Sequence, residues 1–287
     1  MREVVTPWRQ RTRSTILEGM KLVSTLGVVM IAAVCSPLMA ATVPVRFVEG
    51  VSRGYLLLRD VHGRILAHGD LLQVIRGDEI DKRMVFRFQD GSLYEESVSF
   101  TQPGVFRLKT YRLSTRGPAF DVDTEISMTQ ATGAYRVKTK DRKDGREKIL
   151  EGKLELPPDV YNGLIMTIVK DLPKGESVTV HFVAFTPDPR LIELELTPVG
   201  DQETIVGDLK GSAVHYLIKP KLGMWLRLFA TILGRAPSDL HAWVATDEVP
   251  AFVGFEGSLT MQGPVWRIEV VSPRLPDVGT ASRTGGT

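Results

Sequence analysis

Histidine and cysteine are the first side chains to consider for chemistry, because they bind transition metals and act as bases or nucleophiles. The sequence has five histidines and one cysteine, Cys35. No two histidines have the HxH or HExxH spacing that places two metal ligands together, and no cysteine lies near them. We therefore expect no metal and no cofactor. The histidines are His62, His68, His181, His215 and His241.

Motifs for other catalytic chemistries are also missing from the sequence. There is no GxSxG nucleophile elbow, no glycine-rich phosphate loop and no dinucleotide fingerprint. Asp121, Asp123 and Glu125 alternate along one strand face, but the glycine and terminal glutamate of an EF-hand are missing, so we interpret them as a solvated face. His181 is expected on an exposed strand face. Folding can still bring carboxylates from distant strands together as an acid–base pair, so one alternative function is a secreted hydrolase with a polar cavity.

Residues 219–235, KPKLGMWLRLFATILGR, are the clearest functional clue. Apolar residues at helical spacing predict a second short helix at residues 222–234, which is too short to span a bilayer. Residues 210–238 contain five cations and no acid. One interpretation is a core helix or buried loop that caps a barrel mouth. The other is a lid over an apolar ligand or a peripheral membrane contact. Its binding residues are Lys219, Lys221, Trp225, Arg227, Phe229 and Arg235.

Residues 157–172, PPDVYNGLIMTIVKDL, have the apolar spacing of one amphipathic helix. Two prolines open the segment, Asp159 is expected in the first helical turn, and Pro173 follows. Gly163 inside the pattern costs roughly 1 kcal/mol against alanine, so packing must hold the helix. The sequence therefore predicts a central helix at residues 157–172.

Alternating polar and apolar residues on both sides of this segment predict roughly a dozen strands. Asp90-Gly91 and Asp144-Gly145 are typical of hairpin turns. Between residues 105 and 113 the apolar phase changes from even to odd positions, which indicates a β-bulge. The predicted fold is mainly β: a large curved antiparallel sheet or open β-barrel that clasps one central helix.

Residues 20–41 have the parts of a secretory signal peptide: Lys21, an apolar run, and small residues near Ala40. Met20 is an alternative start of translation, and an uncleaved anchor or a lipoprotein at Cys35 are the other interpretations. We expect cleavage near Ala40 and a periplasmic or secreted protein. The predicted domains are a signal peptide at residues 1–40, one β-barrel-like domain at residues 41–272, and a disordered tail at residues 273–287.

The charge balance argues against nucleic acid as a partner. Residues 1–40 hold five cations and two acids, so the remaining chain carries 31 Lys and Arg against 32 Asp and Glu. Proteins that bind nucleic acid usually have a clearly basic face. After cleavage near Ala40 the chain has no cysteine, so its core alone must stabilise it.

Two short sequence segments carry a family resemblance: LPPDVYNGL at residues 156–164 and GPVWRIE at residues 263–269. With the signal peptide and the curved sheet, the chain resembles exported bacterial β-proteins of unknown function over residues 43–272. More loosely, it is similar to the periplasmic half-barrels of lipoprotein carriers and outer-membrane lipoprotein receptors. Those carriers hold acyl chains on a concave apolar face under helical lids, which implies apolar-ligand binding here.

The function expected from the sequence is therefore an exported, non-enzymatic module of the bacterial envelope. It would bind lipid or another apolar small molecule in an open β-barrel, with residues 219–235 as lid or membrane contact. Besides the hydrolase, the alternative is an envelope scaffold that docks a protein partner through the same apolar segment.

Overall fold

The structure is a computed structural model, and it describes residues 42–173, 175–185, 188–206, 209–221, 239–246, 248–260 and 263–272. The predicted signal peptide, the tail at residues 273–287 and the predicted helix at residues 222–234 lie outside these residues. The signal peptide, the tail and the second helix therefore stay predictions from the sequence.

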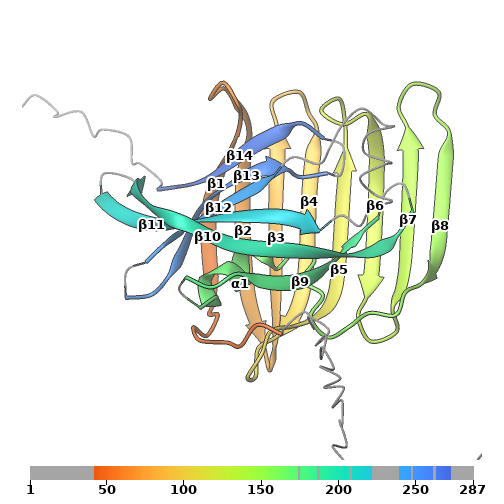
Figure 1. Cartoon of the computed structure of the whole chain (residues 1–287). Helices are drawn as coiled ribbons and strands as arrows, with labels where there is room; N and C mark the ends of the chain where they lie inside the picture. The colour runs from red at the N-terminus through yellow and green to blue at the C-terminus, as the bar shows by residue number, and fades with distance from the viewer. Residues whose placement is uncertain are drawn as a thin grey trace, which may run out of the picture. The chain divides into compact units, whose positions relative to one another are not determined.

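The described chain forms one sheet of fourteen antiparallel strands that does not close on itself (Figure 1). Strands β1 to β8 follow one another as a meander, and β14 to β9 continue the sheet from the other side of β1. In the described residues β8 and β9 are the two edges. The strands are β1 (Ser52–Asp60), β2 (Ile65–Arg76), β3 (Glu79–Phe88), β4 (Leu93–Thr101), β5 (Arg107–Arg116), β6 (Val122–Thr129), β7 (Ala134–Asp141), β8 (Glu147–Lys153), β9 (Val178–Ala184), β10 (Arg190–Val206), β11 (Leu209–Lys221), β12 (Leu240–Ala245), β13 (Ala251–Ser258) and β14 (Val265–Val271).

The predicted fold class is confirmed, including the bulge between residues 105 and 113. Ser99 of β4 pairs with Thr110 of β5, whereas the next residue, Phe100, pairs with Leu108. Lys109 is therefore the extra residue of β5. Because one extra residue reverses the facing of every residue that follows, the buried positions change from even to odd along β5. Such bulges bend a sheet.

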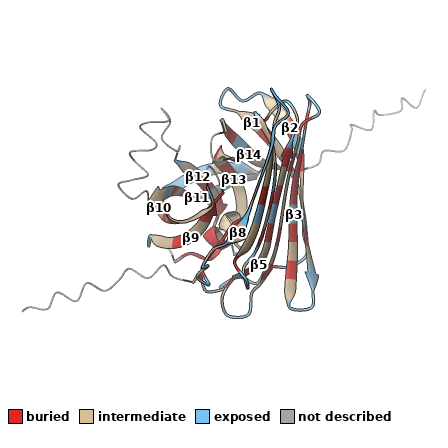
Figure 2. Ribbon diagram, turned by 90° about the vertical axis from the view of Figure 1, so that its right-hand side faces the viewer, coloured by how far each residue is buried: buried red, intermediate tan, exposed pale blue. Residues whose placement is uncertain are grey.

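Alternation along the strands produces a buried concave face. In β3, for example, Ile80, Met84 and Phe86 are buried, while Arg83 and Arg87 are exposed. Figure 2 shows the same alternation of buried and exposed bands along β3 and β5. The inward side chains of both meanders form one hydrophobic core.

The predicted helix at residues 157–172 is wrong in length. Helix α1 covers only Ile165–Ile168, and the 3-10 turn η1 covers Val169–Asp171. Gly163 has φ of +71°, in the left-handed region that a continuous α-helix does not contain. Upstream, Val160 forms a parallel β-bridge with His181. The apolar spacing reflects burial in the core rather than one continuous helix, because Tyr161, Leu164 and Ile168 are all fully buried.

Residues 159–162 cover the outer edge of β9 instead of starting a helix. The Tyr161 amide donates to the His181 carbonyl at 3.0 Å, and the His181 amide donates to the Asp159 carbonyl at 3.0 Å. Asn162 continues this pairing with its side chain: Nδ2 donates to the Val183 carbonyl at 2.9 Å, and Oδ1 accepts from the Val183 amide at 2.8 Å. An edge strand with unpaired backbone groups is thereby protected.

Candidate functional site

An open pocket of about 360 Å³ lies at the turn between β2 and β3. Its lining combines the apolar residues Val45, Val48, Ile75 and Ile80 with two polar residues, Asp78 and Gln102. Val48 is 79% exposed and Ile75 is 46% exposed, so both present apolar surface to solvent. We call this the rim pocket.

The segment at residues 43–50 forms one wall of the rim pocket because it is tied to the core at several points. The Val43 amide donates to the Tyr161 hydroxyl at 2.8 Å, and the Val45 amide donates to the Gly104 carbonyl at 3.0 Å. Gln102 binds the backbone of Glu49 twice: its Oε1 accepts from the amide at 2.7 Å, and its Nε2 donates to the carbonyl at 3.0 Å. The pocket wall is therefore fixed in place.

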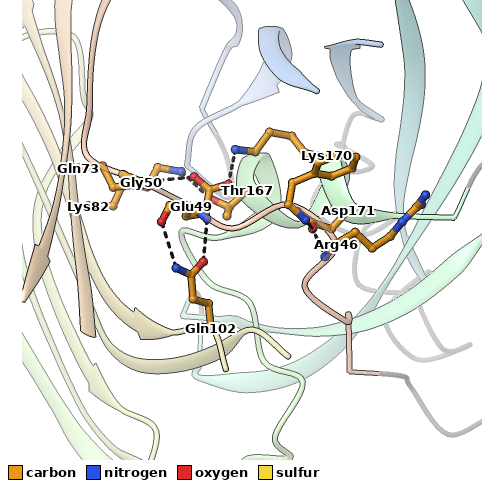
Figure 3. Close-up of polar contacts among 10 residues, drawn as sticks. Arg46, Glu49, Gly50, Gln73, Lys82, Gln102, Thr167, Lys170 and Asp171 are labelled. Carbon is orange, nitrogen blue, oxygen red and sulfur yellow. Dashed lines mark hydrogen bonds and ion pairs between the residues drawn. The ribbon is translucent and has the colours of Figure 1, made fainter. Parts of the chain in front are cut away.

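A buried polar network begins beside the rim pocket (Figure 3). The Glu49 carboxylate forms an ion pair with Lys170 of η1 and accepts from Gln73 Nε2 at 2.9 Å. Gln73 also donates to the Gly50 carbonyl at 2.7 Å. Glu49 and Gln73 are both buried. Because burying a charge is costly unless it is paired, this network has to stay assembled.

Lys82 is a second charged side chain on the concave face. It is buried, and its Nζ donates to Thr167 Oγ1 of α1 at 3.0 Å. Burial, together with the nearby charge of Lys170, lowers the pKa of Lys82 from 10.5 to about 8. Burial also raises the pKa of Glu96 on β4, although the Lys82 charge and the Tyr111 hydroxyl oppose this. The Tyr111 hydroxyl donates to Glu96 Oε1 at 3.2 Å.

Asp171 anchors the start of the described chain to η1. Its Oδ1 accepts from the backbone amides of Arg46 at 2.6 Å and Phe47 at 2.7 Å. Asp171 is fully buried, and its Oδ2 has no hydrogen-bond partner in the described structure. Burial raises the pKa of Asp171, and the two amides partly offset that effect. The carboxyl group acts as a structural clamp.

His181 is not on an exposed face, contrary to the sequence prediction. Its side chain is 18% exposed, and Nδ1 lies 2.8 Å from Oδ2 of Asp159, a residue that is not in a helical turn. A His-Asp pair is one half of a hydrolase triad. Among the described residues, however, no serine or threonine hydroxyl hydrogen-bonds to His181. The pair joins residues 159–162 to β9, and the geometry supports a structural role.

Of the six predicted binding residues, the structure describes only Lys219 and Lys221. Both belong to the end of β11, so the strand extends three residues into the segment that we expected to depart from the β pattern. Lys219 Nζ lies 3.5 Å from Asp239, and Lys221 Nζ donates to Thr179 Oγ1 at 2.8 Å. Trp225, Arg227, Phe229 and Arg235 lie outside the described residues.

Sequence reasoning missed Lys82 and Glu96, although the sequence carries a signal for each. Lys82 has the same phase as Ile80 and Met84 in β3, and Glu96 has the same phase as Tyr94 in β4. A charged residue in the apolar phase of a strand is expected to be buried and therefore to need a partner.

In the parts of the chain that the structure covers, no three His, Cys, Asp or Glu side chains are grouped to hold a metal ion. Within those same parts, no helix has the length and apolar character needed to cross a membrane.

Comparisons with known proteins give a structural neighbour but no family. No family model matches the sequence, and a comparison with curated proteins finds no match. The chain is similar to a solved β-barrel-like protein with a domain of unknown function, DUF1849, from Brucella abortus. The two are 11% identical with a TM-score of 0.41, and the match covers 83% of this chain and 100% of that one.

Proposed function

We propose that this chain is an exported, non-enzymatic module that binds lipid or another apolar molecule in its open β-barrel. The observation that carries the proposal is the rim pocket, where apolar side chains stay exposed on a fixed wall. Small-molecule sites usually have volumes of about 300–1,000 Å³ and mainly apolar walls. The volume of the rim pocket, about 360 Å³, is sufficient for part of an acyl chain or a similar group.

The proposed ligand position is the mouth of the barrel and not its centre. Inward side chains such as Phe86, Phe100 and Phe106 are fully buried in the core. Apolar surface at the mouth, in contrast, gains about 25 cal/mol for each Å² that a ligand removes from water. Asp78 and Gln102, the polar side chains of the lining, would lie at a polar end of the ligand.

The proposal gives residues 219–235 the role of a lid or membrane contact. The ends of the connection between β11 and β12 lie side by side, because Ile218 pairs with Leu240. Hairpin loops usually have 2–5 residues, and much longer connections are often functional. The cations and aromatic residues of this segment suit an anionic lipid surface.

Placing charge in the rim pocket is expected to abolish binding of an apolar probe. In the double variant Val48→Asp/Ile75→Asp, two carboxylates replace exposed apolar walls, so the affinity for a fluorescent fatty acid should fall at least about tenfold. Fluorescence titration measures this directly. Val61→Asp is the matched control, because Val61 is 63% exposed in the turn between β1 and β2 and lies outside the pocket lining. Equal affinity of all three proteins would contradict a ligand site at the rim.

Replacing Trp225 and Phe229 with aspartate tests residues 219–235 separately. We expect the double variant to lose binding to vesicles that contain anionic lipid, because two apolar anchors become charged. Vesicle co-sedimentation measures the loss, and an unchanged far-UV circular dichroism spectrum serves as the folding control. Native mass spectrometry of protein purified from the periplasm would show whether a lipid-sized mass stays bound. Unchanged vesicle binding would remove the membrane contact but leave the rim pocket in place.

A further inference from the structure

Two histidines lie side by side on the outward face of the sheet, away from the rim pocket. His215 on β11 and His241 on β12 have their ring centroids 5.0 Å apart, and the Nε2 atom of His215 lies 2.8 Å from the Nδ1 atom of His241. Trp243 on β12 stacks on His215 with a centroid distance of 4.8 Å and an interplanar angle of 7°. All three side chains are partly exposed.

Neighbouring residues fix the orientation of the His215 ring. The Trp243 Nε1–H group donates to Gln202 Oε1 at 2.8 Å, so the amide nitrogen of Gln202 faces His215 Nδ1 at 3.5 Å. A donor opposite Nδ1 favours the His215 tautomer that carries its proton on Nε2. This Nε2–H group donates a hydrogen bond to the lone pair of His241 Nδ1.

We propose that His215 and His241 together bind a divalent transition-metal ion, with water completing its coordination. Histidine nitrogens bind such ions at about 2.0–2.1 Å, which places two ligands of one ion roughly 3 Å apart. The 2.8 Å separation of these nitrogens is already close to that value. When the ion binds, the proton of His215 moves from Nε2 to Nδ1, where water can accept it in place of the long 3.5 Å contact with Gln202.

A carboxylate on the neighbouring strand lies next to the histidine pair. Glu256 on β13 is the cross-strand neighbour of His241, and its carboxylate forms an ion pair with Arg267 of β14 at 2.6 Å. Among divalent ions, imidazole ligands bind Cu²⁺ most tightly, so Cu²⁺ is the best probe.

Copper quenching of tryptophan fluorescence tests the proposal, because Trp243 stacks on one of the two ligands. We expect Cu²⁺ to quench the wild-type protein and the exposed control variant His68→Asn at the same concentration. In His215→Asn and in His241→Asn, the half-quenching concentration should rise at least about tenfold. In Trp243→Phe the saturable quenching should disappear, although Cu²⁺ still binds.

Electron paramagnetic resonance supplies an independent measurement. The Cu²⁺-loaded wild-type protein should show hyperfine coupling to two imidazole nitrogens, and either histidine variant should show fewer. If His241→Asn binds Cu²⁺ as tightly as wild type, or if the spectrum shows no pair of imidazole nitrogens, the proposed site is overturned.

Discussion

Replacing Lys82 with methionine is expected to stabilise the protein at pH 7 by about 2 kcal/mol. The fall of the Lys82 pKa from 10.5 to about 8 corresponds to about 3 kcal/mol of unfavourable free energy at neutral pH. Loss of the hydrogen bond to Thr167 offsets about 1 kcal/mol of the gain. Methionine has a similar length and leaves no charge in the core, so the melting temperature should rise by about 4–8 °C.

The pH dependence of this effect has a defined sign. Above pH 10.5, Lys82 is neutral in both the folded and the unfolded chain and contributes no difference. As the pH falls from 10.5 to about 8, the unfolded chain takes up a proton that the folded chain does not, so the free energy of unfolding decreases. The advantage of Lys82→Met should therefore be complete below pH 8 and shrink between pH 8 and 10.5.

Urea denaturation of both proteins at pH 7 and pH 10 measures the difference. Lys140→Met, at an exposed position on β7, is the matched control and should change stability by no more than about 0.5 kcal/mol. A Lys82→Met protein that is less stable than wild type at pH 7 would show that the buried charge is fully compensated by its neighbours.

Replacing Asn162 with alanine is expected to destabilise the protein by about 4 kcal/mol. Asn162 is the only asparagine in the sequence and is fully buried. Its amide satisfies both backbone groups of Val183, a residue that is itself fully buried. Alanine leaves two buried polar groups without partners, at about 1–3 kcal/mol each. Because total stability is usually about 5–15 kcal/mol, the loss should be conspicuous.

Thermal denaturation should show a melting temperature lower by about 8–16 °C for Asn162→Ala. Hydrogen exchange at the Val183 amide should accelerate as well, which a general loss of packing would not confine to this position. Ser177→Ala is the control, because its exposed hydroxyl bonds to Thr197 at 3.0 Å and to no other residue that the structure describes. A loss below about 1 kcal/mol for Asn162→Ala would mean that water replaces the side-chain amide at the β9 edge.

Local sequence patterns were sufficient to predict most strands and the bulge. The alternation of polar and apolar residues and the phase change between residues 105 and 113 depend only on which side chains face the core, and both appear in the structure. Residues 157–172 misled the prediction because burial between two sheet halves produces apolar spacing similar to that of a helix. Gly163 and Asn162 were the contrary signals.

The candidate site was largely beyond prediction, since it assembles residues that are distant in sequence. Glu49, Gln73 and Lys170 meet only after β2 and η1 have been placed in three dimensions. The rim pocket likewise combines residues 45–48 with the β2–β3 turn. The alternation of polar and apolar residues along a strand carries no information about such distant contacts. The charge of Lys82 at an apolar position of β3 does, however, indicate a buried ion that needs a partner.

The pairing of β1 with β14 has a consequence for how the protein matures. Arg59 and Glu269, which form an ion pair across these strands, are separated by 210 residues. During synthesis the first eight strands therefore emerge long before the partner of β1, and the hydrogen-bonding groups on one side of β1 stay open. Such a topology folds slowly and exposes a template for aggregation. Until its last strand is made, that side of β1 stays open to pairing with the strands of other chains.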